Sequence, residues 1–226
     1  TRAILPVHLF GLCADIENIL SISRKYDLRV IEDSACGLGS FYKNCHSGTF
    51  GDTGVFSFHP RKSITTGEGG MVTTDSDEIA EKIRQYRDHG AKISDLQRHL
   101  GPKPFLLADH VVAGGNFRMT DIQAALGVSQ MRRVRPIIEE RQHLAAEYSR
   151  SLDCEWLEQP FQHNNFVHSF QSYPCLLIHG GLQLERAEQI RELRNGLMEN
   201  LQLAGISTRP ATHAIHLLTF YKSKYQ

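Results

Sequence analysis

Three side chains in the first third of the sequence could together do amine chemistry. Lys62 lies just beyond the apolar stretch 55–58, Asp33 follows the apolar stretch 28–31, and Ser57 interrupts the first of these stretches near its end. A lysine between an apolar strand and a polar, glycine-rich loop is partly removed from water, which lowers its pKa and makes its amine a nucleophile. Taken alone, Lys62 is explained more simply as a solvated loop lysine, because most lysines are exposed.

The elements that would carry these side chains follow a parallel pattern. Apolar stretches at 3–7, 28–31 and 55–58 predict buried strands, and isoleucine and leucine at helical spacing predict a helix over 14–26. A strand, a helix and a second strand within about thirty residues are typical of a parallel sheet. Ligands of such sheets bind beside the carboxyl ends of the strands. We therefore expect the three side chains to meet at one edge of the sheet.

A lysine, an aspartate and a serine at one edge match a pyridoxal phosphate site. Lys62 would form the Schiff base, Asp33 would keep the pyridine nitrogen protonated, and the Ser57 hydroxyl would bind the phosphate. Simpler alternatives stay open. Asp33 could cap a helix, Ser57 could bond to backbone, and the glycines of 67–70 could serve simply to shape turns. The glycines match neither a Walker loop nor a dinucleotide fingerprint.

The rest of the sequence predicts an α/β protein in two parts. A large domain over residues 1–130 would contain the mainly parallel sheet, and residues 131–226 would form a linking helix and a smaller α/β domain. The expected further elements are a strand at 71–74, a helix at 75–88, a loop-rich stretch at 89–116, a helix from 120 that bends or breaks near Pro136, a strand at 173–178, a helix at 184–203 and a strand beginning at 205–209.

Composition excludes several classes of protein. The 226 residues carry 25 Lys and Arg against 25 Asp and Glu, so there is no charge footprint for nucleic acid or an anionic membrane. The five cysteines have irregular spacings, which indicates reduced thiols in a cytoplasmic protein without a metal site. We find no signal peptide and no apolar run long enough to span a membrane. Both ends of the chain look cut, so we expect a fragment of a longer protein.

Five motifs, in order, resemble the DegT/StrS family of sugar aminotransferases. They are Glu-Asp-Ser-Ala at 32–35, Gly-Asp-Thr-Gly at 51–54, Ser-Phe-His-Pro-Arg-Lys at 57–62, Thr-Thr-Gly-Glu-Gly-Gly at 65–70 and Asn-Phe-Arg-Met-Thr-Asp at 116–121. The resemblance implies a pyridoxal-phosphate enzyme of fold type I, like aspartate aminotransferase. It also implies a homodimer with shared active sites, and a chain that lacks the family's amino- and carboxyl-terminal parts.

The resemblance assigns a role to each matching residue. Lys62 matches the lysine that holds the cofactor and shuttles the proton, and Asp33 matches the partner of the pyridine nitrogen. Ala35 matches the residue packed near the ring, and Ser57 matches a ligand of the phosphate. Asn116 matches the asparagine that reaches the phosphate of the neighbouring protomer. The matching Arg118 has no assigned role, since helix capping and surface pairing explain it equally well.

Two departures from the family pattern stand out. The family often has Gln or His three residues after the aspartate, near the cofactor's ring hydroxyl, and this sequence has Cys36 there. The family's upstream segment, with a phosphate cradle at a helix N-terminus and an aromatic residue stacked on the ring, is absent from these 226 residues.

The predicted function is transfer of an amino group from glutamate or glutamine to a keto sugar, which we expect to be nucleotide-linked, in the biosynthesis of amino sugars, cell-surface polysaccharides or secondary metabolites. One alternative is a sugar dehydratase of the same fold. Such relatives can carry a histidine in place of the lysine, so Lys62 argues against it. The other alternative is a non-catalytic homologue, which the set of Lys62, Asp33 and Ser57 disfavours.

Overall fold

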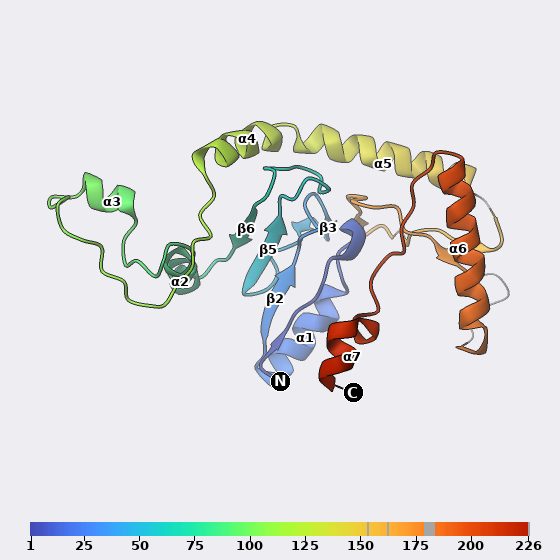
Figure 1. Ribbon diagram of the computed structural model, residues 1–226, viewed down its shortest axis with the longest axis horizontal. Helices are drawn as coiled ribbons and strands as arrows, with labels where there is room; N and C mark the ends of the chain where they lie inside the picture. The colour runs from blue at the N-terminus through green and yellow to red at the C-terminus, as the bar shows by residue number, and fades with distance from the viewer. Residues whose placement is uncertain (153, 162, 179–183, 226) are drawn as a thin grey trace. The chain divides into compact units, whose positions relative to one another are not determined.

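A computed structural model describes residues 1–152, 154–161, 163–178 and 184–225 (Figure 1). The chain forms two compact units: residues 1–147 with 162–173, and residues 148–161 with 174–226. We describe each unit by itself. These units do not test the domain boundary predicted after residue 130, which concerns the domains of the whole protein and stays a prediction.

The first unit contains the sheet that bears the site. Its elements are β1 (Ala3–Ile4), the 3-10 helix η1 (Leu9–Gly11), α1 (Ile16–Tyr26), β2 (Arg29–Asp33), β3 (Phe41–Tyr42), β4 (Cys45–His46), β5 (Thr53–Ser57), β6 (Gly70–Thr73), α2 (Asp77–Arg87), α3 (Asp95–Leu100), α4 (Asp121–Met131), most of α5 (Val134–Ser151) and β8 (Phe166–Val167).

The main sheet has the strand order β1-β2-β5-β6. β1, β2 and β5 are parallel, and only β6 runs antiparallel to its neighbour β5, which confirms the predicted α/β class with a mainly parallel sheet. The first strand is shorter than the stretch 3–7, because Pro6 has no N–H to donate to a ladder. Beyond Pro6, Val7 still forms a single parallel bridge to Asp33.

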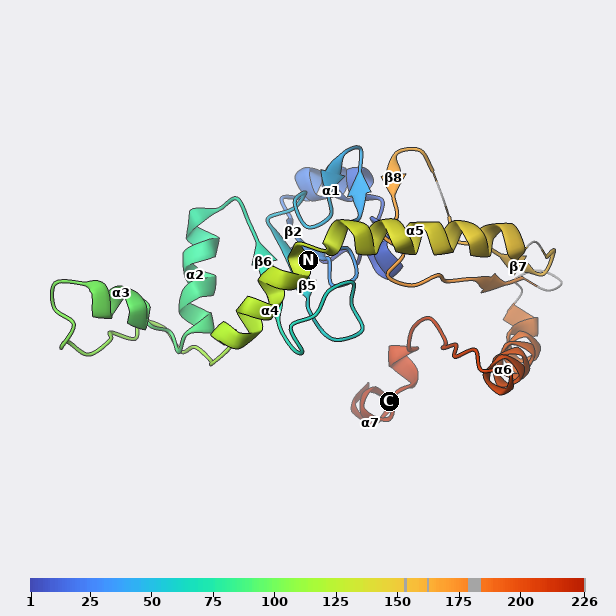
Figure 2. The ribbon, with the colours of Figure 1, turned by 90° about the horizontal axis from the view of Figure 1, so that it is seen from above.

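The first unit contains two clusters of buried apolar residues. On α1, Ile16 is buried together with Cys13 and Tyr42. A second cluster of Phe56, Phe58 and Ile64 packs against α5 and the segment before α4; its partly buried members are Leu38, Met119, Val134 and Ile137. Figure 1 shows the carboxyl ends of β2 and β5 pointing toward α4 and the start of α5, and Figure 2 shows the same helices from above.

The predicted long helix is broken before its proline. α4 ends at Met131 and α5 begins at Val134, so Pro136 lies in the first turn of α5, where its missing N–H costs nothing. Thr120 caps α4 as expected, accepting a hydrogen bond from the Gln123 N–H in a capping box. The loop-rich stretch 89–116 also contains a short helix, α3.

A segment far along the chain returns to complete the first unit. β8 joins the small antiparallel sheet β4-β3-β8. Beyond it, the Ser169 N–H donates to the Gly11 carbonyl and the Ser169 hydroxyl lies 2.9 Å from that of Ser40. The buried ring of His168 stacks on Phe170 at a centroid distance of 3.9 Å, and its Nδ1 accepts the Phe170 N–H. Burial lowers the pKa of His168 to about 4, although a hydrogen bond to the Gly11 backbone acts in the opposite direction.

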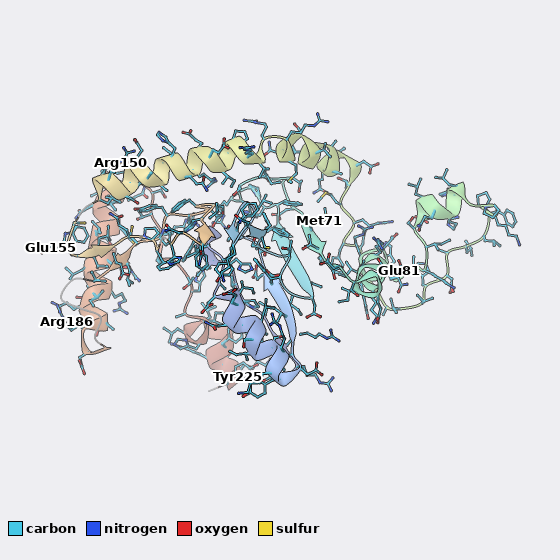
Figure 3. The ribbon with its side chains drawn as sticks, turned by 180° about the vertical axis from the view of Figure 1, so that it is seen from behind. Met71, Glu81, Arg150, Glu155, Arg186 and Tyr225 are labelled. Atoms are coloured by element: carbon cyan, nitrogen blue, oxygen red, sulfur yellow. The ribbon has the colours of Figure 1, made fainter. Side chains whose placement is uncertain are left out.

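The second unit is a smaller α/β unit. It contains the end of α5, β7 (Leu157–Glu158), β9 (Leu176–Leu177), the 3-10 helix η2 (Leu184–Arg186), α6 (Ala187–Leu203), the 3-10 helix η3 (Ile215–Leu217) and α7 (Thr219–Tyr225). Figure 3 labels Arg150 near the end of α5 and Arg186 just before α6. No helix in the described part of the chain is long and apolar enough to cross a membrane.

The expected strand at 205–209 is wrong. Gly205 has a φ of +81° and ends α6, with the Ile206 N–H donating back to the Leu201 carbonyl. The residues after it are exposed and have no ladder partner in the described chain. The apolar character of Ile206 indicated a strand, but a strand forms only where another strand is available to pair with it.

We predict that His168 makes the protein less stable as the pH falls from 6.5 to about 4. In that range the unfolded chain binds a proton at this imidazole and the folded protein does not, so the free energy of unfolding decreases by up to about 3 kcal/mol. In urea titrations, His168→Asn, which keeps an oxygen able to accept the Phe170 N–H, should show a smaller decrease than the wild type. Equal decreases in the two proteins would contradict this role of His168.

Candidate functional site

The candidate site lies where two neighbouring parallel strands end. β2 ends at Asp33 and β5 ends at Ser57, and the register pairs Asp33 with Val55. Both carboxyl ends therefore lie at the same edge of the sheet, as the sequence predicted. The chain leaves β5 through a short turn that contains Lys62, and it leaves β2 through Ala35 and Cys36.

Asp33 is fixed through its backbone, and its carboxylate remains available. Its N–H donates to the Pro6 carbonyl and its carbonyl accepts the His8 N–H, at 2.8 and 3.0 Å. One carboxylate oxygen accepts the Ala35 N–H at 3.0 Å. No helix begins after Asp33, so the alternative in which it caps a helix is wrong. The second carboxylate oxygen has no hydrogen-bond partner among the described residues.

Lys62 is held in a tight turn, and its amine contacts a thiol. The Lys62 N–H donates to the His59 carbonyl at 2.9 Å, and the His59 ring accepts the Arg61 N–H. The Lys62 side chain is half-buried, and its Nζ lies 3.2 Å from the Sγ of Cys36. Within the described chain Lys62 forms no ion pair with a carboxylate. The amine is therefore not neutralised by an acidic neighbour.

The two small residues predicted for the site are at the same edge. Ser57 is half-buried and pairs with Gly70 of β6. Its hydroxyl accepts a long hydrogen bond, 3.4 Å, from the His59 N–H. The alternative in which Ser57 serves to bond to backbone therefore has only a weak hydrogen bond in its favour. Ala35 is half-buried beside Asp33. The structure thus brings four of the five predicted site residues to one region.

Asn116 is apart from these four residues. It is exposed and bridges to Asp88 beyond the end of α2, and its side-chain oxygen accepts a hydrogen bond from Arg118 at 3.2 Å. It has no hydrogen bond to Asp33 or Lys62 in the part of the chain described. Arg118 forms an ion pair with Asp88 at 3.1 Å, so surface pairing describes it better than capping.

Sequence reasoning missed a buried acidic group that supports the site. Glu32, next to Asp33 on β2, is fully buried and accepts four hydrogen bonds, each 2.7 Å long. The donors are the Nε2 of His8 and the backbone N–H groups of Gly48, Phe50 and Gly51. The other nitrogen of His8 accepts the Ala14 N–H, so the ring carries its proton on Nε2.

These bonds keep Glu32 ionised inside the protein. Burial by itself raises the pKa of Glu32, but the hydrogen bonds from His8 and from three backbone N–H groups outweigh it, and the pKa is lowered. The loop that supplies them packs so tightly that a Cβ on Gly54 would overlap the backbone of Gly48. The family motifs include Glu32 and the glycines near it, but nothing in the sequence indicated that Glu32 is buried or that the loop binds it.

The groups at this edge suit pyridoxal phosphate. A half-buried amine without a carboxylate partner in the described chain can bind an aldehyde, and a carboxylate with one oxygen free of described partners can pair with a protonated pyridine nitrogen. The Ser57 hydroxyl, weakly bonded in the structure, can donate to a phosphate oxygen. The Cys36 thiol occupies the position beside the amine.

The comparison with protein families decides the relationship. The model of the DegT/DnrJ/EryC1/StrS aminotransferase family matches residues 1–226. The chain belongs to this family. The predicted resemblance is confirmed, and with it the type I fold of these enzymes.

Relatives and solved structures agree. The chain is 37% identical over 226 residues to the uncharacterized protein MJ1066 of Methanocaldococcus jannaschii, covering all of this chain and 56% of that protein. It is 34% identical over 223 residues to GDP-perosamine synthase of Caulobacter vibrioides, covering 98% of this chain and 55% of that one.

Among solved structures, PseC of Helicobacter pylori, an aminotransferase involved in the biosynthesis of pseudoaminic acid, has a TM-score of 0.85 and 29% identity, covering 100% of this chain and 56% of PseC. Spr1654 of Streptococcus pneumoniae, a putative sugar aminotransferase in its PLP form, has a TM-score of 0.84 and 26% identity, covering 100% and 58%. The chain spans about half the length of the relatives it matches.

Replacing the buried acid should destabilise the protein. Glu32→Gln offers one oxygen and an NH₂ group to four donors, so at least one N–H would face another donor in a buried place. We expect the free energy of unfolding at pH 7 to fall by about 3 kcal/mol or more. The matched control is Glu78→Gln, which removes only an exposed pair with Lys82 and should change little. Equal denaturation curves for Glu32→Gln and the wild type would show that the network is unimportant.

Proposed function

We propose that this chain is the lysine-bearing part of a pyridoxal-phosphate-dependent aminotransferase that transfers an amino group from glutamate or glutamine to a nucleotide-linked keto sugar. The family and its PLP-form and PMP-form structural neighbours indicate pyridoxal phosphate as the cofactor. The observation that carries the proposal is the half-buried Lys62 amine, without a carboxylate partner in the described chain, at the strand edge that also bears Asp33.

Each residue at the edge has a defined task. Lys62 would hold the cofactor through its Nζ. The Asp33 carboxylate would pair with the pyridine nitrogen and keep it protonated, because a charge pair in a partly buried place favours the charged form. The Ser57 hydroxyl would donate a hydrogen bond to the phosphate, and Ala35 lies beside Asp33, where a small side chain would leave room for a flat ring.

Proton transfer is the second task of the lysine. When bound, the cofactor supplies an electron sink that lets a proton leave the carbon next to the amino group. Near the bound cofactor, the Lys62 amine would take that proton and return it at another carbon, which is general base and then general acid catalysis. The turn through His59 keeps the amine within reach, since it fixes the backbone of Lys62.

The substrate class rests on the relatives. GDP-perosamine synthase is named for a sugar attached to GDP, and PseC for its part in making pseudoaminic acid. Both names point to amino sugars, and the first supports a nucleotide-linked substrate. A role in the biosynthesis of amino sugars or surface polysaccharides, in the cytoplasm, follows from this proposal.

A homodimer with shared sites is part of the proposal. The segment around Asn116 exposes a group of large apolar side chains, which we call the 105–128 surface: Phe105, Leu107, Phe117, Ile122 and Val128. Covering them with a second copy of the protein would remove this apolar area from water. It would also let Asn116, which has no hydrogen bond to its own chain's Asp33 or Lys62 in the described structure, serve the partner's site.

The lysine is tested by its covalent bond to the cofactor. In the full-length protein, Lys62→Ala should abolish the visible absorbance of lysine-bound pyridoxal phosphate, and should lower transamination by about 10²–10⁴-fold or more. Lys82→Ala, which removes an exposed lysine paired with Glu78, should behave like the wild type. Turnover is read as the mass change of a keto sugar incubated with glutamate or glutamine. The same absorbance in wild type and Lys62→Ala would refute the proposal.

The dimer is tested at the 105–128 surface. Ile122→Glu places a charge on a side chain that is 85% exposed in the single chain, and should raise the dimer dissociation constant at least about 30-fold, or about 2 kcal/mol. Leu203→Glu, at a side chain 87% exposed on α6, is the control and should leave association unchanged. Sedimentation analysis of the full-length proteins measures both, and identical association of Ile122→Glu and wild type would place the interface elsewhere.

A further inference from the structure

Cys36 gives this site a contact that no part of the proposed reaction requires. Its Sγ lies 3.2 Å from the Nζ of Lys62, within the range of about 3–3.5 Å at which two groups are placed to react with each other. Both side chains are half-buried. A small oxidant can therefore reach the sulfur, while the surrounding protein holds the amine next to it.

The backbone on both sides fixes this pair. Next to Cys36, Gly37 is buried; its N–H donates to the Ser34 carbonyl at 2.8 Å, and its own carbonyl accepts the Ser47 hydroxyl at 2.6 Å. On the other side, the turn that places Lys62 is followed by Ile64, which is 1% exposed in the apolar cluster. The two reactive atoms are thus presented by anchored segments that are far apart in the sequence.

We propose that Cys36 and Lys62 form a reversible sulfur–nitrogen cross-link when the protein meets a peroxide. Hydrogen peroxide first oxidises the Cys36 thiol to a sulfenic acid. In this step the O–O bond of the peroxide breaks, an S–O bond forms and one water is released. The Lys62 nitrogen then attacks the sulfur, the S–N bond forms, and the S–O bond breaks with loss of a second water. In sum, one thiol, one amine and one peroxide give a sulfenamide and two waters, so the sulfur is oxidised by two electrons and the peroxide is reduced.

The other thiols of the first unit do not offer this chemistry. Cys13 is buried, and burial together with the charge of Glu32 raises its pKa to about 12, which keeps it as an unreactive thiol. Cys45 is exposed and has no amine in hydrogen-bond contact in the described structure. Cys45 therefore provides a matched control for oxidation without cross-linking.

The cross-link has a regulatory consequence that rests on the proposed function. It occupies the amine that would bind the cofactor, so an oxidised site cannot hold pyridoxal phosphate covalently. Conversely, a lysine already bound to the cofactor cannot attack the sulfenic acid, so the cofactor protects the enzyme. Thiol reductants, which attack the sulfur and release the amine, restore the site.

The experiment reads the cross-link by mass and needs no activity. Full-length protein freed of cofactor is treated with a small excess of hydrogen peroxide. We expect the intact mass to fall by about 2 Da, the mass of two hydrogens, and peptide mapping to join the peptides of Cys36 and Lys62. Dithiothreitol should reverse the change, and prior saturation with pyridoxal phosphate should prevent it.

Three variants sharpen the result. Cys36→Ala should lose the cross-link, Lys62→Arg should show oxygen addition at Cys36 in place of the mass decrease, and Cys45→Ala should cross-link like the wild type. Oxygen addition without a joined peptide in the wild type, or a disulfide in place of the Cys36–Lys62 peptide, would overturn the proposal. A cross-link in a protein that binds no pyridoxal phosphate would support this inference and refute the proposed function, so the two fail separately.

Discussion

The buried carboxylate of Glu32 is the interaction on which this site depends. It joins three segments that are distant in the sequence: β2, the turn containing His8, and the loop 48–51. An ionised group without water is costly, and only a full set of donors makes its burial tolerable. The loop, the imidazole and the strand must therefore adopt one arrangement together. That arrangement fixes the end of β2, where the next residue is Asp33.

The reactive groups themselves are held more loosely than their supports. Asp33 keeps one carboxylate oxygen, and Ser57 most of its hydrogen-bonding capacity, for something other than the described protein. The hydrogen-bond contact of the Lys62 amine within the described residues is with the Cys36 thiol. This division follows from physical chemistry, because a group that must bind a cofactor cannot also be satisfied internally. Glu32 and His8 are fully buried, whereas these three are half-buried at the edge.

The family motifs combine both kinds of residue. In the stretch 51–54, Gly51 donates to Glu32, Asp52 accepts the Val30 N–H, and Gly54 allows the loop to approach β5. These residues hold the chain before β5 against β2 and against β5 itself. A sugar aminotransferase motif read only for catalytic residues would miss this scaffold. The 105–128 surface differs from this scaffold, since its large apolar side chains are exposed within the single chain.

The sequence alone determined the α/β class, the parallel strands and the residues at their ends, because apolar runs and turn residues are local signals. It also selected Lys62, Asp33 and Ser57, since a strand end can be recognised without knowing what lies beside it. Tertiary structure alone decided the Glu32–His8 bond, the return of 166–171 to the first unit, and the contact between Cys36 and Lys62. It likewise removed the strand expected at 205–209. Each of these depends on which distant segments meet, and no local pattern of residues specifies that.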